Sequence, residues 1–329
     1  MQHDIAVLGS GSWGTALAIA QALAERSVLL WSRRPERAAE ISRNRHVAPY
    51  LPADIRLPGG ITVTSDLADC RDAAIILSVT PAQAMRATLT ALGRANRLVL
   101  CCKGVERGTG ALMPEAAKEA LPSAEIFMLS GPNFAGEVAR GLPAAATVAG
   151  PSLESAAALA NDLATPALRL YPSDDMTGAA LGGALKNVMA IAAGAVEGAG
   201  LGENARAAVA TRGLAEIARI AVAMGAERDT LMGLAGIGDL MLTCSGLQSR
   251  NYSLGVVLGQ GRTLADILGE RQTVAEGVAT AAAARALAAR LGVEAPITSA
   301  VDDVTAGRMT IPDAVEALMR RPSVQDERQ

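Results

Sequence analysis

Histidine and aromatic side chains are scarce in this sequence of 329 residues. The chain has two histidines, His3 and His46, and aromatic residues make up 2% of it. With only two histidines, the sequence gives no basis for a histidine-rich metal site, and we expect no metal. Its basic residues are scattered and do not form a stripe interleaved with aromatic ones, so we expect no nucleic-acid partner.

A large net charge of either sign is also missing. Thirty Lys and Arg residues stand against 33 Asp and Glu residues, which gives a formal net charge of −3. The isoelectric point calculated from the sequence is near 5.6. Such a balance provides no general attraction to nucleic acid or to an anionic membrane. An anionic ligand must therefore be held by locally placed lysines, arginines and backbone amides.

Cysteines are few, and their spacing does not fit a disulfide or metal framework. The four are Cys70, Cys101, Cys102 and Cys244, and the two adjacent ones lie in an apolar run. This pattern is typical of small core residues in a reducing compartment. The first apolar run, residues 5–8, is too short for the hydrophobic region of a signal peptide. We therefore expect a cytoplasmic protein.

One long apolar run could be mistaken for a membrane span. In residues 176–196 the only charged residue is Lys186, and Asn187 follows it directly. A lysine near the centre makes membrane insertion costly. The run is better interpreted as a buried helix of a soluble protein, and we expect no membrane span.

The length suits two domains, and the pattern changes near Ser173. Up to that point, short β-rich runs alternate with helical segments, which predicts an α/β domain with a mostly parallel sheet in residues 1–172. The predicted strands are residues 4–9, 27–31, 61–64, 74–79, 97–101, 125–129, 145–149 and 168–171. Residues 173–329 lack strand-like runs and predict an all-helical domain, in which Arg212 and Glu216 are spaced for an exposed ion pair.

A glycine-rich segment directly follows the first predicted strand. It reads G-x-G-x-x-G, with Gly9, Gly11 and Gly14 at the glycine positions, and it opens a predicted helix. In a Rossmann domain these glycines permit a tight turn, the approach of a pyrophosphate to the backbone, and close packing of helix on strand. Free amides at the helix start then face the phosphates. The alternative is a glycine turn that binds nothing.

The end of the second predicted strand bears on which dinucleotide binds. An NAD-type site has a carboxylate about twenty residues past the glycines, but here the strand is followed by Arg33 and Arg34. Paired guanidinium groups suit a 2′-phosphate. This favours NADPH, with NADH still an alternative, unless the two arginines are simply solvated.

Two lysines are candidates for acid–base chemistry. Lys186 lies among small and apolar residues, where desolvation lowers a lysine pKa towards the range useful for proton transfer. Carbonyl reduction needs such a proton donor. Lys103 follows a predicted strand, at the edge of the sheet where ligands bind. The alternatives are a snorkelling Lys186 and a solvated Lys103 in a turn.

Two later segments provide groups for a phosphorylated substrate. Asp239 follows a glycine-rich turn and could accept substrate hydroxyl groups, restrain Lys186, or cap a helix. Ser249, Arg250 and Asn251 precede a helical segment, so a hydroxyl, a guanidinium and a helix N-terminus come together as a phosphate grip. Capping of that helix by Ser249 or Asn251 is compatible with binding.

Taken together, these segments resemble the bacterial-type NAD(P)-dependent glycerol 3-phosphate dehydrogenases over nearly the whole chain. The matching segments are residues 9–17, 50–52, 103–104, 131–135, 184–187, 238–240, 249–251 and 276–277. The resemblance implies a helical domain like that of 6-phosphogluconate dehydrogenase. It also implies a reversible NAD(P)H-dependent reduction of dihydroxyacetone phosphate to sn-glycerol 3-phosphate, which supplies glycerophospholipid synthesis.

The resemblance also implies roles for individual residues, with Lys186 accepting the proton in the oxidative direction. The residues expected to contact substrate are Lys103, Gly131, Asn133, Lys186, Asp239, Ser249, Arg250 and Asn251. The residues expected to contact NADPH are Ser12, Trp13, Arg33, Arg34, Tyr50, Lys103, Ala135, Arg250, Val274 and Glu276. The family usually has Ser or Thr where this chain has Asn133.

Two other functions fit part of the pattern. A related two-domain, lysine-dependent reductase of a keto or hydroxy acid would act on a carboxylate instead of a phosphate. A non-catalytic NADPH sensor would keep the glycine segment and Arg33 without needing Lys186 or Arg250. The sequence does not define the oligomeric state, and a homodimer is compatible with it.

Overall fold

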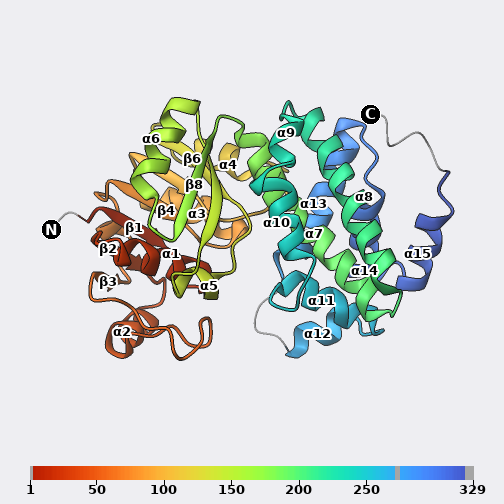
Figure 1. The fold of residues 1–329 in the computed structure, drawn as a ribbon, viewed down its shortest axis with the longest axis horizontal. Coiled ribbons are helices and arrows are strands. Elements are labelled where there is room, and N and C mark those ends of the chain that lie inside the picture. The colour runs from red at the N-terminus through yellow and green to blue at the C-terminus, as the bar shows by residue number, and fades with distance from the viewer. Residues whose placement is uncertain (1–2, 271–274, 323–329) are drawn as a thin grey trace.

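The computed structural model describes residues 3–270 and 275–322. An α/β domain and a helical domain lie side by side (Figure 1). The sheet has eight strands in the order β3-β2-β1-β4-β5-β6-β7-β8, and only the β6–β7 pair is antiparallel. The strands are β1 Ile5–Leu8, β2 Val28–Trp31, β3 Ile61–Thr64, β4 Ile75–Ser78, β5 Arg97–Leu100, β6 Glu125–Ser130, β7 Ala144–Ala149 and β8 Leu168–Ser173. The predicted mostly parallel sheet is confirmed.

Helices cover both faces of the sheet, which explains why the inner strands β1 and β2 are apolar at every position. In β1, Val7 packs in the cluster that includes α1 and α6, whereas Leu8 packs in the cluster that includes α3 and α4. The helices of this domain are α1 Ser12–Leu23, α2 Pro35–Asn44, α3 Ala82–Leu92, α4 Met113–Ala120, α5 Ala135–Ala139 and α6 Leu153–Leu163, with a short 3-10 turn at Leu67–Cys70.

The second domain is helical, as predicted, and is built around α7. Its elements are α7 Met176–Gly198, α8 Gly202–Ala223, α9 Arg228–Leu231, a π-helical turn Leu234–Gly238, α10 Asp239–Thr243, α11 Arg250–Gly259, α12 Leu264–Glu270, α13 Glu276–Leu291, α14 Pro296–Thr305 and α15 Ile311–Met319. By length and composition α7 could cross a membrane, but 89% of its most apolar window is buried inside the fold. It therefore serves as the core helix of this domain.

Glycines allow α7 and α11 to approach at backbone distance. A Cβ atom added at Gly194 or Gly198 of α7 would lie 2.1 or 2.0 Å from a backbone oxygen of α11. Gly255 and Gly259 of α11 face backbone oxygens of α7 in the same way, at 2.1 and 2.3 Å. Small residues at such spacing let two helices pack closely. This contact fixes where α11, and with it Arg250, begins relative to α7.

The prediction that Glu216 forms an exposed pair with Arg212 is wrong. Glu216 is fully buried, and its carboxylate accepts hydrogen bonds from the backbone amides of Ile297 and Thr298, at 2.8 and 2.9 Å. It thus satisfies free amides at the start of α14. Burial raises the pKa of Glu216, although these hydrogen bonds oppose the shift. Helical spacing alone does not show which polar side chain another helix will cover.

Candidate active site

The glycine segment has the geometry of a dinucleotide-binding turn. Gly9 adopts φ +127°, and a Cβ atom there would lie 2.9 Å from the carbonyl oxygen of Val79. A Cβ atom at Gly14 would lie 2.0 Å from the carbonyl oxygen of Gly9, so helix α1 can pack on the turn only with glycine at this position. Beside Gly11 there is open space, which leaves room for a pyrophosphate. Trp13 packs at the edge of the core behind this turn.

The second strand ends where a ribose phosphate is expected. Arg33 and Arg34 are both exposed, and Arg34 is the N-cap residue of α2. The loop that carries Tyr50 is tied to the glycine turn, because Ser12 Oγ donates a hydrogen bond to the carbonyl oxygen of Tyr50 at 2.9 Å. The half-exposed Tyr50 ring lies 5.8 Å from the guanidinium carbon of Arg37. Of the predicted cofactor residues, Ser12 and Tyr50 are therefore in direct contact.

Two lysines from different domains meet at a single carboxylate. Asp239, the first residue of α10, is 1% exposed at its side chain. Lys186 Nζ on α7 donates to Asp239 Oδ1, and Lys103 Nζ, just after β5, donates to Asp239 Oδ2 at 2.5 Å. Lys103 Nζ also lies 3.4 Å from the carbonyl oxygen of Gly131. Of the roles considered for Asp239, the structure shows the restraint of Lys186.

Burial lowers the pKa of Lys186 towards the range useful for proton transfer. The residue is 9% exposed, which excludes a snorkelling lysine. Desolvation lowers the pKa of Lys186 to about 8, Asp239 opposes that shift, and the positive charge of Lys103 reinforces it. An amine with such a pKa can lose and regain a proton near neutral pH. The two ammonium groups and one carboxylate leave a net positive charge, which suits an anionic substrate.

A side-chain network links α7, α11 and α13 next to these lysines. Asn251 Nδ2 donates to Asn187 Oδ1 at 3.0 Å, and Asn251 Oδ1 accepts from the backbone amide of Gly277 at 3.0 Å. Ser249 caps α11 by accepting from the amide of Tyr252 at 3.2 Å. The structure thus shows the capping role considered for Ser249. Both ends of the Asn251 amide have partners, so this residue fixes the position of the helix start.

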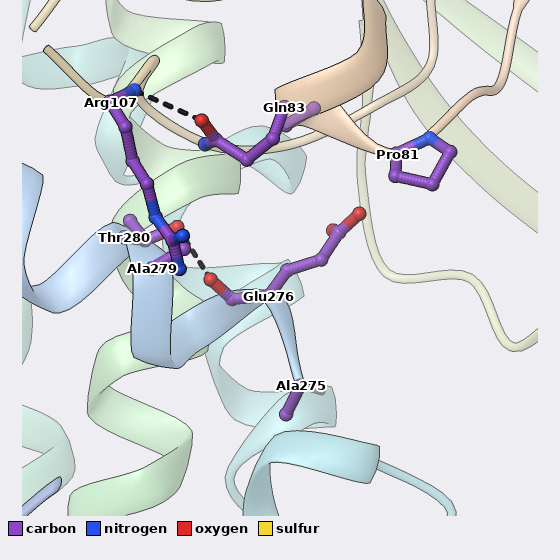
Figure 2. Close-up of a pocket in the computed structure, with 8 residues that line it drawn as sticks. Pro81, Gln83, Arg107, Ala275, Glu276, Ala279 and Thr280 are labelled. Atoms are coloured by element: carbon purple, nitrogen blue, oxygen red, sulfur yellow. Dashed lines mark hydrogen bonds between the residues drawn. The ribbon is translucent and has the colours of Figure 1, made fainter. Parts of the chain in front are cut away.

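Glu276 lies where α13 meets the α/β domain. Its side chain points towards Pro81, and it lines a pocket of about 160 Å³ between α3 and α13 (Figure 2). Burial raises the pKa of Glu276, whereas the positive charges of Arg250, Lys103 and Lys186 lower it. Because all three cations act on the Glu276 carboxyl group, this group must lie close to the lysine pair and to the start of α11. Val274, predicted to contact NADPH, lies outside the described residues.

Asn133 is held by only one end of its amide group. Its Nδ2 donates to the carbonyl oxygen of Ala145 at 3.0 Å, whereas Oδ1 is buried and has no hydrogen-bond partner among residues 3–270 and 275–322. The Ala145 contact orients the amide, because a carbonyl oxygen can only accept. The residue thus presents an acceptor, where Ser or Thr could also donate. Ala135 begins α5 two residues later.

The cysteines and the possible metal ligands do not point to a thiol nucleophile or to a metal centre. The four cysteines are free and buried, as predicted for core residues, and burial raises the pKa of Cys244, beside Lys186, to about 12. They are therefore neutral thiols and not nucleophiles. In the part of the chain that the structure describes, no cluster of three or more His, Cys, Asp or Glu side chains could hold a metal ion.

Sequence reasoning missed Ser130, the last residue of β6. Its hydroxyl is buried, as are those of Ser78 and Thr80 at the end of β4, and no described residue forms a hydrogen bond with any of the three. Ligands bind at this carboxyl edge of a parallel sheet. Position was the available signal, because Ser130 ends a strand-like run directly before Gly131.

Known proteins of one family match this sequence over nearly the whole chain. Residues 4–156 match the family model for the N-terminus of NAD-dependent glycerol-3-phosphate dehydrogenase, and residues 175–316 match that for its C-terminus. The glycerol-3-phosphate dehydrogenase (NAD(P)+) of Caulobacter vibrioides is 51% identical over 324 residues, 97% of this chain and 98% of that protein. The Rhodospirillum rubrum enzyme of the same name is 52% identical, covering 97% of this chain and 92% of that one.

A solved structure supports the same assignment. Glycerol-3-phosphate dehydrogenase from Coxiella burnetii superposes with a TM-score of 0.92 at 35% sequence identity, covering 97% of this chain and 99% of that one. Fold, site geometry and sequence similarity therefore agree. The chain belongs to the NAD-dependent glycerol-3-phosphate dehydrogenase family, whose members are oxidoreductases that use a nicotinamide cofactor.

Proposed function

We propose that this protein reduces dihydroxyacetone phosphate to sn-glycerol 3-phosphate with NADPH, reversibly, and so supplies glycerophospholipid synthesis in the cytoplasm. The observation that carries the proposal is the shared carboxylate of Asp239, which holds Lys186 and Lys103 together at the carboxyl edge of the sheet. This arrangement provides a proton donor and a positive site for an anionic ketone. The names of the relatives point to the same substrate.

The glycine turn and the second strand support the choice of cofactor. When bound, a nicotinamide cofactor supplies the hydride that reaches the carbonyl carbon. The open space beside Gly11 and the amides of α1 would hold its pyrophosphate. Exposed Arg33 and Arg34 would pair with a 2′-phosphate, which favours NADPH over NADH.

Lys186 supplies the proton in this reaction. As hydride reaches the carbonyl carbon, the Lys186 ammonium gives its proton to the carbonyl oxygen and becomes a neutral amine, which solvent reprotonates. In the reverse direction the neutral amine takes the hydroxyl proton. Asp239 holds the side chain in place and stabilises its charged form, whereas Lys103 keeps the pKa of Lys186 low and provides positive charge for the substrate.

The start of α11 would bind the phosphate. Arg250 is the first residue of this helix, and the helix N-terminus attracts anions. Ser249 and Asn251 flank it, and their hydrogen bonds to Tyr252, Asn187 and Gly277 fix the position of the Arg250 backbone. Gly131 and Asn133 would face the substrate from the end of β6, with Asn133 Oδ1 free to accept from a substrate hydroxyl.

The decay of NADPH absorbance tests this proposal directly. We expect rapid turnover with dihydroxyacetone phosphate and far slower turnover with unphosphorylated dihydroxyacetone. Turnover with a keto acid, but not with the phosphate ester, would identify a related lysine-dependent reductase. An absence of turnover with any ketone, together with tight NADPH binding, would identify a non-catalytic sensor.

A further inference from the structure

A buried hydroxyl group beside the lysine pair has no partner in the protein. Ser130 is 1% exposed, and no described residue forms a hydrogen bond with its Oγ. Buried polar groups nearly always have partners, so an exception in an active site calls for an explanation. The next residue, Gly131, accepts a hydrogen bond from Lys103 Nζ, which places the end of β6 directly at the lysine pair.

Helix α7 has a gap in which this hydroxyl lies. A Cβ atom at Gly183 would come within 2.7 Å of Ser130 Oγ and 3.3 Å of Lys103 Cδ. Any side chain at Gly183 would therefore displace the hydroxyl. Gly183 is one turn before Lys186, and helix side chains lean towards the N-terminus, so the Lys186 side chain extends over the same turn.

We propose that Ser130 is a positioning residue for Lys186, whose amine it hydrogen-bonds when that side chain turns from Asp239 to the substrate. A hydroxyl group suits this task because it can accept from an ammonium and donate to a neutral amine. Ser130 therefore serves Lys186 both before and after its proton moves to the substrate oxygen, while keeping its own proton. This inference rests on the proposed function.

Several other groups act electrostatically on or near Lys186, and none of them is on β6. They are Asp239 of α10, Cys244 directly after that helix, Lys103 after β5, and Glu276 of α13 with its neighbour Arg250. Removing the Ser130 hydroxyl leaves these groups in place. A change in the titration of Lys186 in a Ser130 variant therefore reports on the hydroxyl group itself.

The test compares Ser130→Ala, which removes the hydroxyl, with Ser130→Thr, which keeps it. We expect Ser130→Ala to lower kcat for dihydroxyacetone phosphate by about three- to tenfold, as for the loss of one hydrogen bond, with NADPH affinity within about twofold. The alkaline limb of the profile of kcat against pH should move to lower pH by about half to one unit. The reason is that the charged amine makes the stronger hydrogen bond to the hydroxyl, so it loses more than the neutral amine does. Ser130→Thr should retain the position of that limb.

Gly183→Ala provides an independent perturbation. Its methyl group would displace the Ser130 hydroxyl. As a single substitution it should therefore shift the alkaline limb of the kcat profile as Ser130→Ala does, and in the double variant it should add little to that shift. Competitive acetylation of Lys186 in the complex with NADP+ and dihydroxyacetone phosphate, which cannot react with each other, followed by mass spectrometry across pH, measures the same titration without turnover. It should show the same downward shift in both single variants.

Two results would overturn the role of Ser130. One is an unchanged limb and an unchanged acetylation profile in Ser130→Ala. The other is equal loss of kcat in the Ala and Thr variants with lower melting temperatures and no shift, which would indicate packing alone. If the unaltered protein fails to reduce dihydroxyacetone phosphate, the proposed function fails, whereas the acetylation profiles still decide whether Ser130 hydrogen-bonds Lys186.

Discussion

At the scale of single residues, the site depends on partners that lie far apart in the sequence. Lys186 could be predicted because it is the only charged residue in a long apolar run. Its pairing with Asp239, and the second bond from Lys103 to that carboxylate, could not be deduced from local pattern, because they join residues from two domains. Ser130 was missed for a related reason, since an unpartnered hydroxyl is visible only once its surroundings are known.

Lys186→Ala should abolish most of the turnover without abolishing cofactor binding. We expect kcat to fall by roughly a hundred- to ten-thousand-fold, the usual effect of removing a general acid–base group. NADPH affinity, measured by fluorescence titration, should change little. Lys118, an exposed lysine of α4, provides the matched control, since Lys118→Ala should leave kcat unchanged. Near-normal turnover of Lys186→Ala would move the acid–base role to Lys103.

The two directions of the reaction should depend on pH in opposite ways. Burial lowers the pKa of Lys186 to about 8. Reduction needs the charged amine, so its kcat should fall as pH rises through that value. Oxidation needs the neutral amine, so its kcat should rise over the same range. Steady-state kinetics in both directions would show this, and parallel profiles would contradict it.

Removing the charge of Asp239 should shift the pH dependence of kcat in both directions of the reaction. The carboxylate opposes the lowering of the Lys186 pKa, so in Asp239→Asn the limbs should shift to lower pH. Limbs that stay in place in this variant would show that the titrating group is not Lys186.

The nucleotide preference should depend on Arg33 and Arg34. Both are exposed at the end of β2, where a 2′-phosphate is expected. Replacing both by Ala should weaken NADPH much more than NADH, because only NADPH carries that phosphate. Dissociation constants for the two cofactors, measured over a range of salt concentrations, would test this. An equal loss of affinity for NADPH and NADH would mean that the two arginines do not bind the 2′-phosphate.

At the scale of elements, sequence pattern located strands and helices better than it located their faces. All eight predicted strands occur. Glu216 was wrongly predicted to be exposed, because its role depends on α14, some eighty residues later in the chain. The glycines of α7 and α11 are plain in the sequence, but their pairing requires the fold.

Close packing of α7 on α11 should make Gly198→Ala and Gly255→Ala strongly destabilising. Each new methyl group would lie about 2 Å from a backbone oxygen of the facing helix, so the helices must separate. We expect a loss of about 1–3 kcal/mol, the usual range for overpacking, or more, because backbone cannot give way as a side chain can. Urea denaturation measures this.

Gly59→Ala is the matched control for these two substitutions, because a Cβ atom at Gly59 meets nothing within 4 Å. A loss for Gly198→Ala or Gly255→Ala no larger than that of Gly59→Ala would refute the close approach. Because α11 carries Arg250 at its start, the two variants should also raise KM for dihydroxyacetone phosphate.

At the scale of the whole molecule, the candidate active site is a contact between the domains. The last strand ends at Ser173 and α7 begins at Met176, and the division between residues 172 and 173 stays a prediction. Lys103 belongs to the α/β domain, whereas Lys186 and Asp239 belong to the helical domain. The ion pairs that prepare the site therefore also hold the two domains against each other.

Asp239→Asn should weaken the whole molecule by leaving two lysines facing each other across this contact. Breaking a buried ion pair typically costs about 3–5 kcal/mol, because the remaining charge loses its partner. Here Lys186 and Lys103 have side chains only 11% and 16% exposed, so water can screen them only in part. We expect a lower free energy of unfolding and faster proteolysis between the domains.

Removing one of the two positive charges should restore part of that loss. Lys103→Met in the Asp239→Asn background leaves a single buried ammonium, so the double variant should be more stable than Asp239→Asn alone. In the natural background, the same Lys103→Met substitution should destabilise, because it removes a hydrogen bond to Asp239. The double-mutant cycle compares the free energies of unfolding of the natural protein, Asp239→Asn, Lys103→Met and the double variant. Additive losses would show that Lys103 and Asp239 do not interact across this contact.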